Sequence, residues 1–272
     1  MLPRAVCIAA VCLVCWPAFA HGIGVWSTTE EFGFGFLVPP VSAFLVWLRR
    51  AELRQSIRDG ADAGLIVVAC ALVIYTLAHR VQINAVAGLA VVPLLLGCVI
   101  YLWGWRAARI LGFPIGFLGF GLGLFRGLLD TVGFAMQGLT ALGAGLVTQM
   151  AGLGIARDGL VLRTNDFSFV VAEPCSGMSS LVSLLALAAV WTHLSQGKLP
   201  ARIAILASVL PIVLLANTIR VSLVLLIASI GGQEAALGFF HSASSLVLFG
   251  LALAGLLFIS RVVGCKAPRF AI

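Results

Sequence analysis

The segment at residues 173–177 (Glu-Pro-Cys-Ser-Gly) contains the only cysteine of the chain that has polar, turn-forming neighbours, Cys175. It stands at the start of an apolar run, Ser176–Leu194, which is long enough to form a membrane helix. Pro174 ends the preceding extended stretch, and the hydroxyl of Ser176 can satisfy free amides of the starting helix. The positive end of a helix dipole stabilises a thiolate, so a thiol at this position is a candidate nucleophile. A structural cysteine in a helix-start loop is the alternative interpretation.

Arg220 lies inside another apolar run, Ile203–Ile230. A charge at membrane depth costs a few kcal/mol unless it is paired or hydrated, so it is a functional hypothesis by default. If Ile203 marks the inner face, a rise of about 1.5 Å per residue places Arg220 about 25 Å across a hydrocarbon core of about 30 Å. Asn217, on the same helical face, can orient the guanidinium or a substrate carbonyl. An arginine that only snorkels to the outer interface is the alternative.

His241 follows Gly231 and Gly232 and is expected to start the final helix, Phe239–Val262, at the same outer level. With Cys175 and Arg220 it would complete a set of nucleophile, oxyanion stabiliser and general acid/base. No sequence motif supports a metal, haem, nucleotide or other cofactor site. The remaining histidines are expected to be structural or interfacial: His21, His79 and His193.

The composition defines the elements that must position these residues. Apolar residues make up 61% of the 272 residues and charged residues 10%, with a mean hydropathy of +1.14. Soluble domains contain about 45–50% and 25%, so a soluble protein is excluded, and we expect one all-α polytopic membrane domain over residues 1–272. About eight transmembrane helices are expected: Met1–Ala20, Phe32–Leu48, Gly64–Ala78, Asn84–Trp103, Thr131–Gly152, Ser176–Leu194, Ile203–Ile230 and Phe239–Val262. Residues 1–20 are either a retained first helix or a cleaved signal peptide.

The net charge of +7 indicates loop orientation in such a protein rather than nucleic-acid binding. Four arginines between residues 49 and 58 place that loop on the cytoplasmic side. Alternation then puts Cys175 outside if the segment between Ile110 and Gly152 crosses only once. We therefore interpret the glycine-rich stretch Leu111–Gly127 as interfacial or re-entrant.

Residues 157–172 (RDGLVLRTNDFSFVVA) alternate apolar and polar side chains and contain turn formers at Asp158-Gly159 and Asn165-Asp166. This pattern predicts a short β-hairpin on the outer side, immediately before Cys175.

With these residues in view, the chain resembles the exosortase/archaeosortase family of membrane cysteine transpeptidases. The resemblance rests on the Cys175-Ser176-Gly177 element, on the segment from Asn217 to Arg220, and on His241; it extends over roughly residues 154–256. It assigns a catalytic core to residues 110–272. Family members often carry glycine four residues after the histidine, where this chain has Ser245.

The resemblance implies that the protein cleaves the C-terminal sorting signals of exported proteins, which consist of a short motif such as Pro-Glu-Pro, a membrane helix and a basic tail. Cys175 would form a thioester, Arg220 would stabilise the oxyanion and His241 would transfer protons, in a bacterial inner membrane with the site facing the periplasm. Ser176, Gly177 and Asn217 would support the site or bind substrate. Glu173 would tune His241 or contact the substrate, with a simple loop carboxylate as the alternative. Two other interpretations stay open: a membrane transporter, and a non-catalytic scaffold in envelope polysaccharide export.

Overall fold

The computed structural model describes the backbone of residues 2–57, 60–122, 126–163, 168–171, 176–242 and 244–265. Within these ranges it does not describe the side chains of residues 2–12, 30–31, 126–131, 233, 237 and 239–242. The chain divides into two compact units, Met1–Gly127 and Leu128–Ile272. The second unit begins inside the expected catalytic core of residues 110–272.

The first unit is helical throughout its described part. Its elements are α1 (Leu2–Thr28), the 3₁₀ helix η1 (Glu30–Leu37), α2 (Val38–Leu48), α3 (Arg50–Ser56), α4 (Ala63–Arg80), α5 (Asn84–Phe117) and the 3₁₀ helix η2 (Leu118–Phe120). Helix α1 continues through Ala20 as one helix, and its residues Cys15, Ala18 and Phe19 pack with α4 and α5. The choice between a retained helix and a signal peptide stays a prediction.

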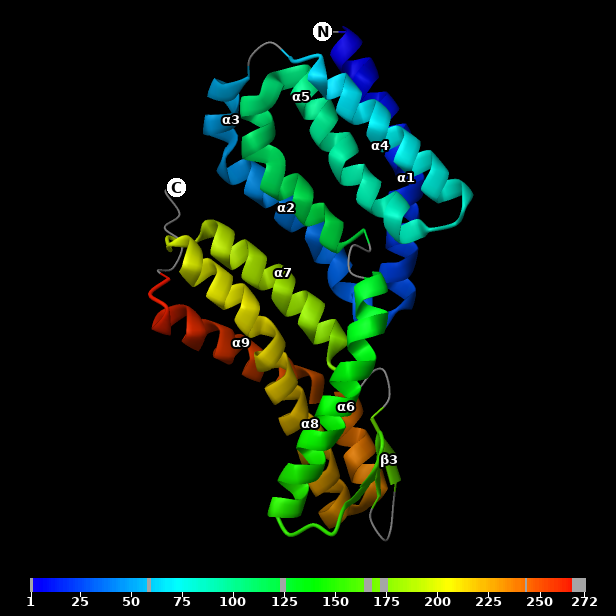
Figure 1. Ribbon diagram of the computed structural model, residues 1–272, viewed down its shortest axis with the longest axis vertical. Coiled ribbons are helices and arrows are strands. Elements are labelled where there is room, and N and C mark those ends of the chain that lie inside the picture. The colour runs from blue at the N-terminus through cyan, green and yellow to red at the C-terminus, as the bar shows by residue number, and fades with distance from the viewer. Residues whose placement is uncertain are drawn as a thin grey trace. The chain divides into compact units, whose positions relative to one another are not determined.

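Helix α5 contains a break at Gly104, where φ is +81° and ψ is 176°, and Figure 1 shows the chain reversing direction there. The first arm packs on α1 and α4, and the second arm packs on α2 and α3. The second arm and η2 contain residues 111–120 of the stretch Leu111–Gly127. At about 1.5 Å per residue, an arm of this length is shorter than a full crossing of about 30 Å. Our interpretation of that stretch as interfacial or re-entrant stays a prediction.

Helices α4 and α5 approach each other closely at Gly64. A Cβ atom there would lie 2.4 Å from the backbone nitrogen of Tyr101 and 2.6 Å from the carbonyl oxygen of Gly97. Small residues at such contacts let membrane helices pack through dispersion forces, since lipid provides no hydrophobic drive between helices.

In its described residues, the second unit contains four helices and a small sheet: α6 (Arg126–Met150), β1 (Ala156–Asp158), β2 (Val161–Arg163), β3 (Ser168–Val170), α7 (Met178–Leu194), α8 (Leu199–Ser242) and α9 (Ser244–Val262). These four helices share one apolar cluster. We call it the bundle cluster. Its buried members are Met136, Met178, Leu184, Ala188, Ile205, Val209, Val213, Ala216, Leu248, Ala252, Leu256 and Cys265.

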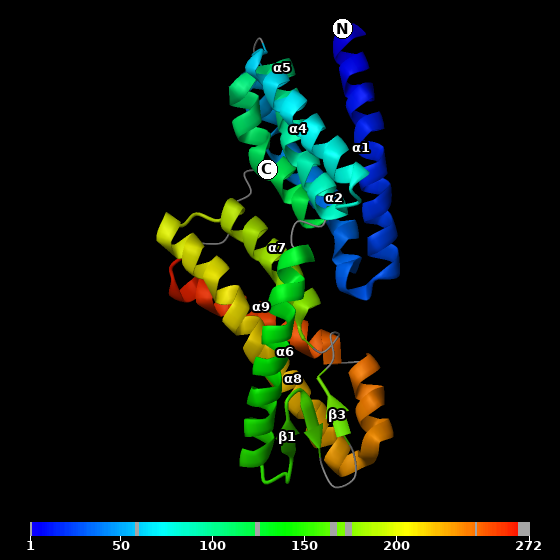
Figure 2. The same cartoon turned by 45° about the vertical axis from the view of Figure 1, so that its right-hand side comes forward.

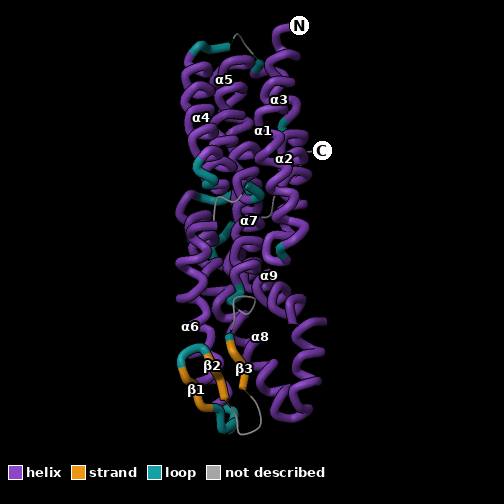
Figure 3. The backbone as a smooth tube through the Cα atoms, turned by 90° about the vertical axis from the view of Figure 1, so that its right-hand side faces the viewer, coloured by secondary structure: helices purple, strands orange, loops and turns teal. Residues whose placement is uncertain are grey.

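The three strands form an antiparallel sheet in the order β1-β2-β3 (orange in Figure 3). The prediction of extended structure before Cys175 is confirmed, but the expected single hairpin is a three-stranded meander that begins at Ala156. The sheet packs on α6 and α8 through a second apolar cluster, which we call the sheet cluster. Its buried members are Ala141, Ala144, Ile155, Leu162, Val171, Val221 and Leu225.

Helix α8 is longer than the predicted span Ile203–Ile230 and breaks at Gly232, where φ is +78°. Beyond the break, the last residues of α8 run in the opposite direction, and α9 starts at Ser244 (Figure 2). The expectation that His241 starts the final helix is therefore wrong, because His241 lies in the last turn of α8. A break of this kind depends on packing and is not encoded by hydropathy.

Four helices of the described residues are long and apolar enough to cross a membrane, or five if the pair Phe32–Leu48 and Arg50–Ser56, bent by 65°, is one span. The four are α4, α5 with η2, the part of α8 that ends at Gly232, and α9. The multi-pass all-α architecture is confirmed, while the count of eight stays a prediction.

Candidate functional site

A polar layer separates the two apolar clusters of the second unit. Along α8 the bundle cluster ends at Ala216 and the sheet cluster begins at Val221, with Asn217 and Arg220 between them. Along α6, Thr140 lies in the same interval, between Met136 and Ala141. The polar layer also contains the first residues of α7 and α9, as the contacts below show.

Arg220 is buried in this layer, with 6% of its surface exposed. Its Nε donates a hydrogen bond to the Oγ atom of Ser244, 3.1 Å away, at the start of α9. From Leu199 to Arg220 the helix rises about 32 Å at 1.5 Å per residue, close to one hydrocarbon thickness. The stretch of α8 from Leu199 to Arg220 is thus long enough for one crossing, and α8 then continues beside the sheet.

Asn217 is fully buried one turn before Arg220. Its Nδ2 donates a hydrogen bond to the Oγ1 atom of Thr140, which is also fully buried, 3.1 Å away on α6. A buried amide group without such partners would cost about 1–3 kcal/mol. The sequence analysis missed both Thr140 and Ser244. Their only signal was a hydroxyl group in an apolar surrounding at the depth of Arg220.

The start of α7 lies against Asn217. Gly177 has φ +77°, and a Cβ atom at this residue would lie 3.1 Å from the Cγ atom of Asn217, so both the backbone conformation and the space favour glycine. Ser176 is fully buried, and its Oγ accepts a hydrogen bond of 3.3 Å from the backbone nitrogen of Met178. The structure therefore brings together four of the predicted site residues: Ser176, Gly177, Asn217 and Arg220.

The other three predicted site residues cannot be placed in the same way. Glu173 and Cys175 lie outside the described residues, and for His241 only the backbone is described. Their roles therefore remain expectations based on the sequence.

The opposite end of the helix bundle has a different chemistry. There Trp191 donates from Nε1 to the Oγ of Ser260 at 2.9 Å, and a terminal nitrogen of Arg202 donates to the carbonyl oxygen of Ser195 at 3.0 Å. The described basic residues at this end are Lys198, Arg202 and Arg261. His193 lies in the last turn of α7 at this end, far along the helix from Gly177.

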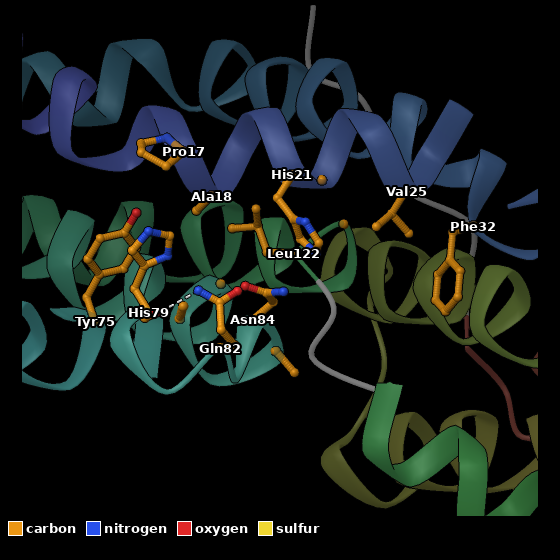
Figure 4. A pocket seen from close by; sticks show the side chains of 15 residues that line it. Pro17, Ala18, His21, Val25, Phe32, Tyr75, His79, Gln82, Asn84 and Leu122 are labelled. Atoms are coloured by element: carbon orange, nitrogen blue, oxygen red, sulfur yellow. Dashed lines mark hydrogen bonds between the residues drawn. The ribbon is translucent and has the colours of Figure 1, made fainter. Parts of the chain in front are cut away.

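The first unit contains a cavity of about 220 Å³ beside α1, α4 and the start of α5. His21 and His79 both line it, together with Gln82 and Asn84 (Figure 4). The ring of His79 stacks on Tyr75, with 6.0 Å between the ring centroids, and its carbonyl oxygen accepts a hydrogen bond from Gln82. Nothing in the sequence pattern predicted that these two histidines would lie at one cavity.

The polar layer has two groups that stabilise negative charge. A guanidinium held between apolar clusters acts in a medium of low dielectric constant, where it stabilises negative charge far more strongly than in water. The amides at the start of α7 add positive potential beside the Cys-Ser-Gly element. Among the described side chains, no cluster of three or more His, Cys, Asp or Glu could hold a metal ion.

These features define a multi-pass membrane protein with a buried cationic site at the end of a helix bundle. The family model of the transmembrane exosortases (Exosortase_EpsH) matches residues 26–258, and the chain belongs to the exosortase family. The match extends well beyond residues 154–256, where the sequence analysis found the resemblance, and takes in most of the first unit. Comparison with curated proteins and with solved structures gave no match.

Proposed function

We propose that this protein is a membrane cysteine peptidase and transpeptidase that cleaves the C-terminal sorting signals of exported proteins. The family membership supports this proposal. The observation that carries it is the buried Arg220, one helical turn from Asn217. Asn217 lies against Gly177, the residue two positions after Cys175. Two peptide units limit the separation of the Cα atoms of Cys175 and Gly177 to about 7.6 Å.

In the first half of the reaction, the thiolate of Cys175 attacks the scissile carbonyl carbon and forms a tetrahedral intermediate. Arg220 stabilises the negative charge that develops on the carbonyl oxygen. The intermediate collapses as the C–N bond breaks, and the imidazolium of His241 gives its proton to the leaving amine. The exported protein is then held as a thioester on Cys175.

In the second half, an acceptor nucleophile attacks the thioester carbon and gives its proton to His241. The C–S bond breaks, and Cys175 returns to the thiolate. The substrate helix and its basic tail stay in the bilayer, which presents the cleavage point at the membrane surface. Ser176, Gly177 and Asn217 shape the site, and Glu173 binds substrate or tunes His241.

The orientation follows from charge. Lys198, Arg202 and Arg261 lie at the end of the bundle opposite to Arg220, and cytoplasmic loops retain such residues. The site accordingly faces the periplasm. We expect a phosphatase reporter fused after Asp166 to be active, since that enzyme needs the oxidising periplasm, and a fusion after Lys198 to be inactive. The reverse pattern would contradict both the orientation and the proposed access of exported substrates.

The direct test is capture of the thioester. The protein is co-expressed with an exported substrate that ends in a motif, a membrane helix and a basic tail. We expect a covalent adduct that neutral hydroxylamine releases and that peptide mapping assigns to the peptide containing Cys175. An adduct on another cysteine would contradict the proposed mechanism. So would the formation of cleaved product without any adduct, when samples are trapped at short reaction times.

A further inference from the structure

We propose that Ser244 is a positioning residue that fixes the orientation of the Arg220 guanidinium; this inference rests on the proposed function. The two residues are both buried, and Nε of Arg220 donates to Oγ of Ser244 over 3.1 Å. They lie 24 residues apart, one near the middle of α8 and the other at the start of α9. The bond therefore joins two helices at the level of the polar layer.

The choice of nitrogen matters for the chemistry. A guanidinium is planar, and its Nε–H lies in the plane. An acceptor for Nε–H therefore fixes the rotation of the plane about the Cδ–Nε bond and with it the directions of both terminal amino groups. An arginine side chain loses rotamer entropy when it is held in one conformation. The Ser244 contact holds it before substrate arrives, and preorganised groups of this kind stabilise transition states best.

The position of Ser244 in the sequence adds a second consequence. Gly232 turns the chain back, and the returning residues of α8 lead to Ser244 three residues after His241. The contact between Ser244 and Arg220 thus holds the segment that carries His241, the proposed proton-transfer residue. It holds this segment at the level of Arg220, the proposed oxyanion stabiliser. One hydroxyl group serves both alignments.

The test compares three variants of the full-length membrane protein. Ser244→Ala should lower kcat by about 10-fold to 100-fold, the range expected for misplacing a reacting group, with little change in KM. Ser244→Thr keeps a hydroxyl group and should restore most of the rate. Ser222→Ala is the control, because Ser222 is also buried near Arg220 but its hydroxyl donates to the carbonyl oxygen of Thr218 in its own helix. It should retain the wild-type rate.

A double-mutant cycle separates positioning from folding. Lysine has no Nε–H group in a guanidinium plane, so Ser244→Ala should change the rate less than 2-fold in an Arg220→Lys background. An equal loss in both backgrounds, or a wild-type rate for Ser244→Ala, would overturn the proposal. The cycle decides the matter even if the extra methyl group of Ser244→Thr prevents folding.

A readout independent of turnover distinguishes failure of this inference from failure of the proposed function. In ¹⁵N-labelled protein, the Nε–H signal that disappears in Arg220→Lys should exchange with solvent at least about 10-fold faster in Ser244→Ala than in wild type or Ser222→Ala. Unchanged exchange overturns the positioning role. Accelerated exchange, in a protein whose Cys175→Ala variant still cleaves substrate, keeps the contact and rejects the proposed function.

Discussion

Replacing Cys175 with alanine is expected to abolish the thioester adduct and to lower the rate of sorting-signal cleavage by at least about a thousandfold. The physical reason is that, in the proposed mechanism, the thiolate supplies the covalent step, and the remaining groups can only stabilise attack by water. The measurement is the appearance of the shortened exported protein on a gel over time. Cys175→Ser is expected to be nearly as inactive, because a serine hydroxyl, unlike a thiol at a helix start, stays protonated at neutral pH.

The matched control is Cys70→Ala. Cys70 is an exposed thiol on α4 in the first unit, so its removal tests for general effects of losing a cysteine. We expect a wild-type rate. Undiminished cleavage by Cys175→Ala, at equal amounts of protein in the membrane, would reject the peptidase hypothesis and favour a scaffold role in export.

Replacing Arg220 with methionine is expected to lower kcat by about a hundredfold to a thousandfold, as removal of an oxyanion stabiliser does in other enzymes. Methionine keeps most of the volume between the bundle and sheet clusters and removes a buried charge. Such replacements are often neutral or stabilising, so the variant should accumulate in the membrane as well as the wild type. Arg220→Lys keeps a positive charge but loses the planar group and the Nε contact with Ser244. Its kcat should lie between that of the wild type and that of Arg220→Met.

Arg202→Met is the control for Arg220. It removes an arginine from the same helix at the opposite end, where the side chain bonds the carbonyl oxygen of Ser195. We expect its rate to stay within about 3-fold of wild type, since this part-buried hydrogen bond lies at the end of the bundle opposite to the polar layer. A rate for Arg220→Met as high as that of Arg202→Met would show that Arg220 only anchors α8 at the interface.

Simple physics made part of this site predictable. A charge such as Arg220 within an apolar run is costly in lipid, so its depth and its functional weight follow from counting residues at 1.5 Å each. The Cys175-Ser176-Gly177 element could be placed at a helix start for a similar local reason, because turn formers precede an apolar run there. These inferences need only the period of a helix and the thickness of a bilayer.

The predicted position of His241 was wrong because hydropathy does not indicate where a helix breaks and the chain changes direction. The chain stays helical up to Gly231, and only the non-helical backbone of Gly232, with φ +78°, sends the rest of α8 back toward Arg220. The extra strand of the sheet was missed for a related reason. Three-residue strands are held by their pairing partners and by the sheet cluster, and they carry little periodic signal of their own.

The sequence by itself predicted a multi-pass membrane protein, the depth of Arg220, the asparagine beside it and a cysteine at a helix start; the structure bears out the first and the third, and the other two stay predictions. Each depends on residues within a turn or a single span of one another. Only the tertiary structure decided that Thr140, 77 residues before Asn217, holds its amide, and that Ser244 holds the guanidinium of Arg220. The physical reason is that a buried polar group must find a partner, but which hydroxyl group supplies it depends on how the helices pack and where the glycines reverse the chain.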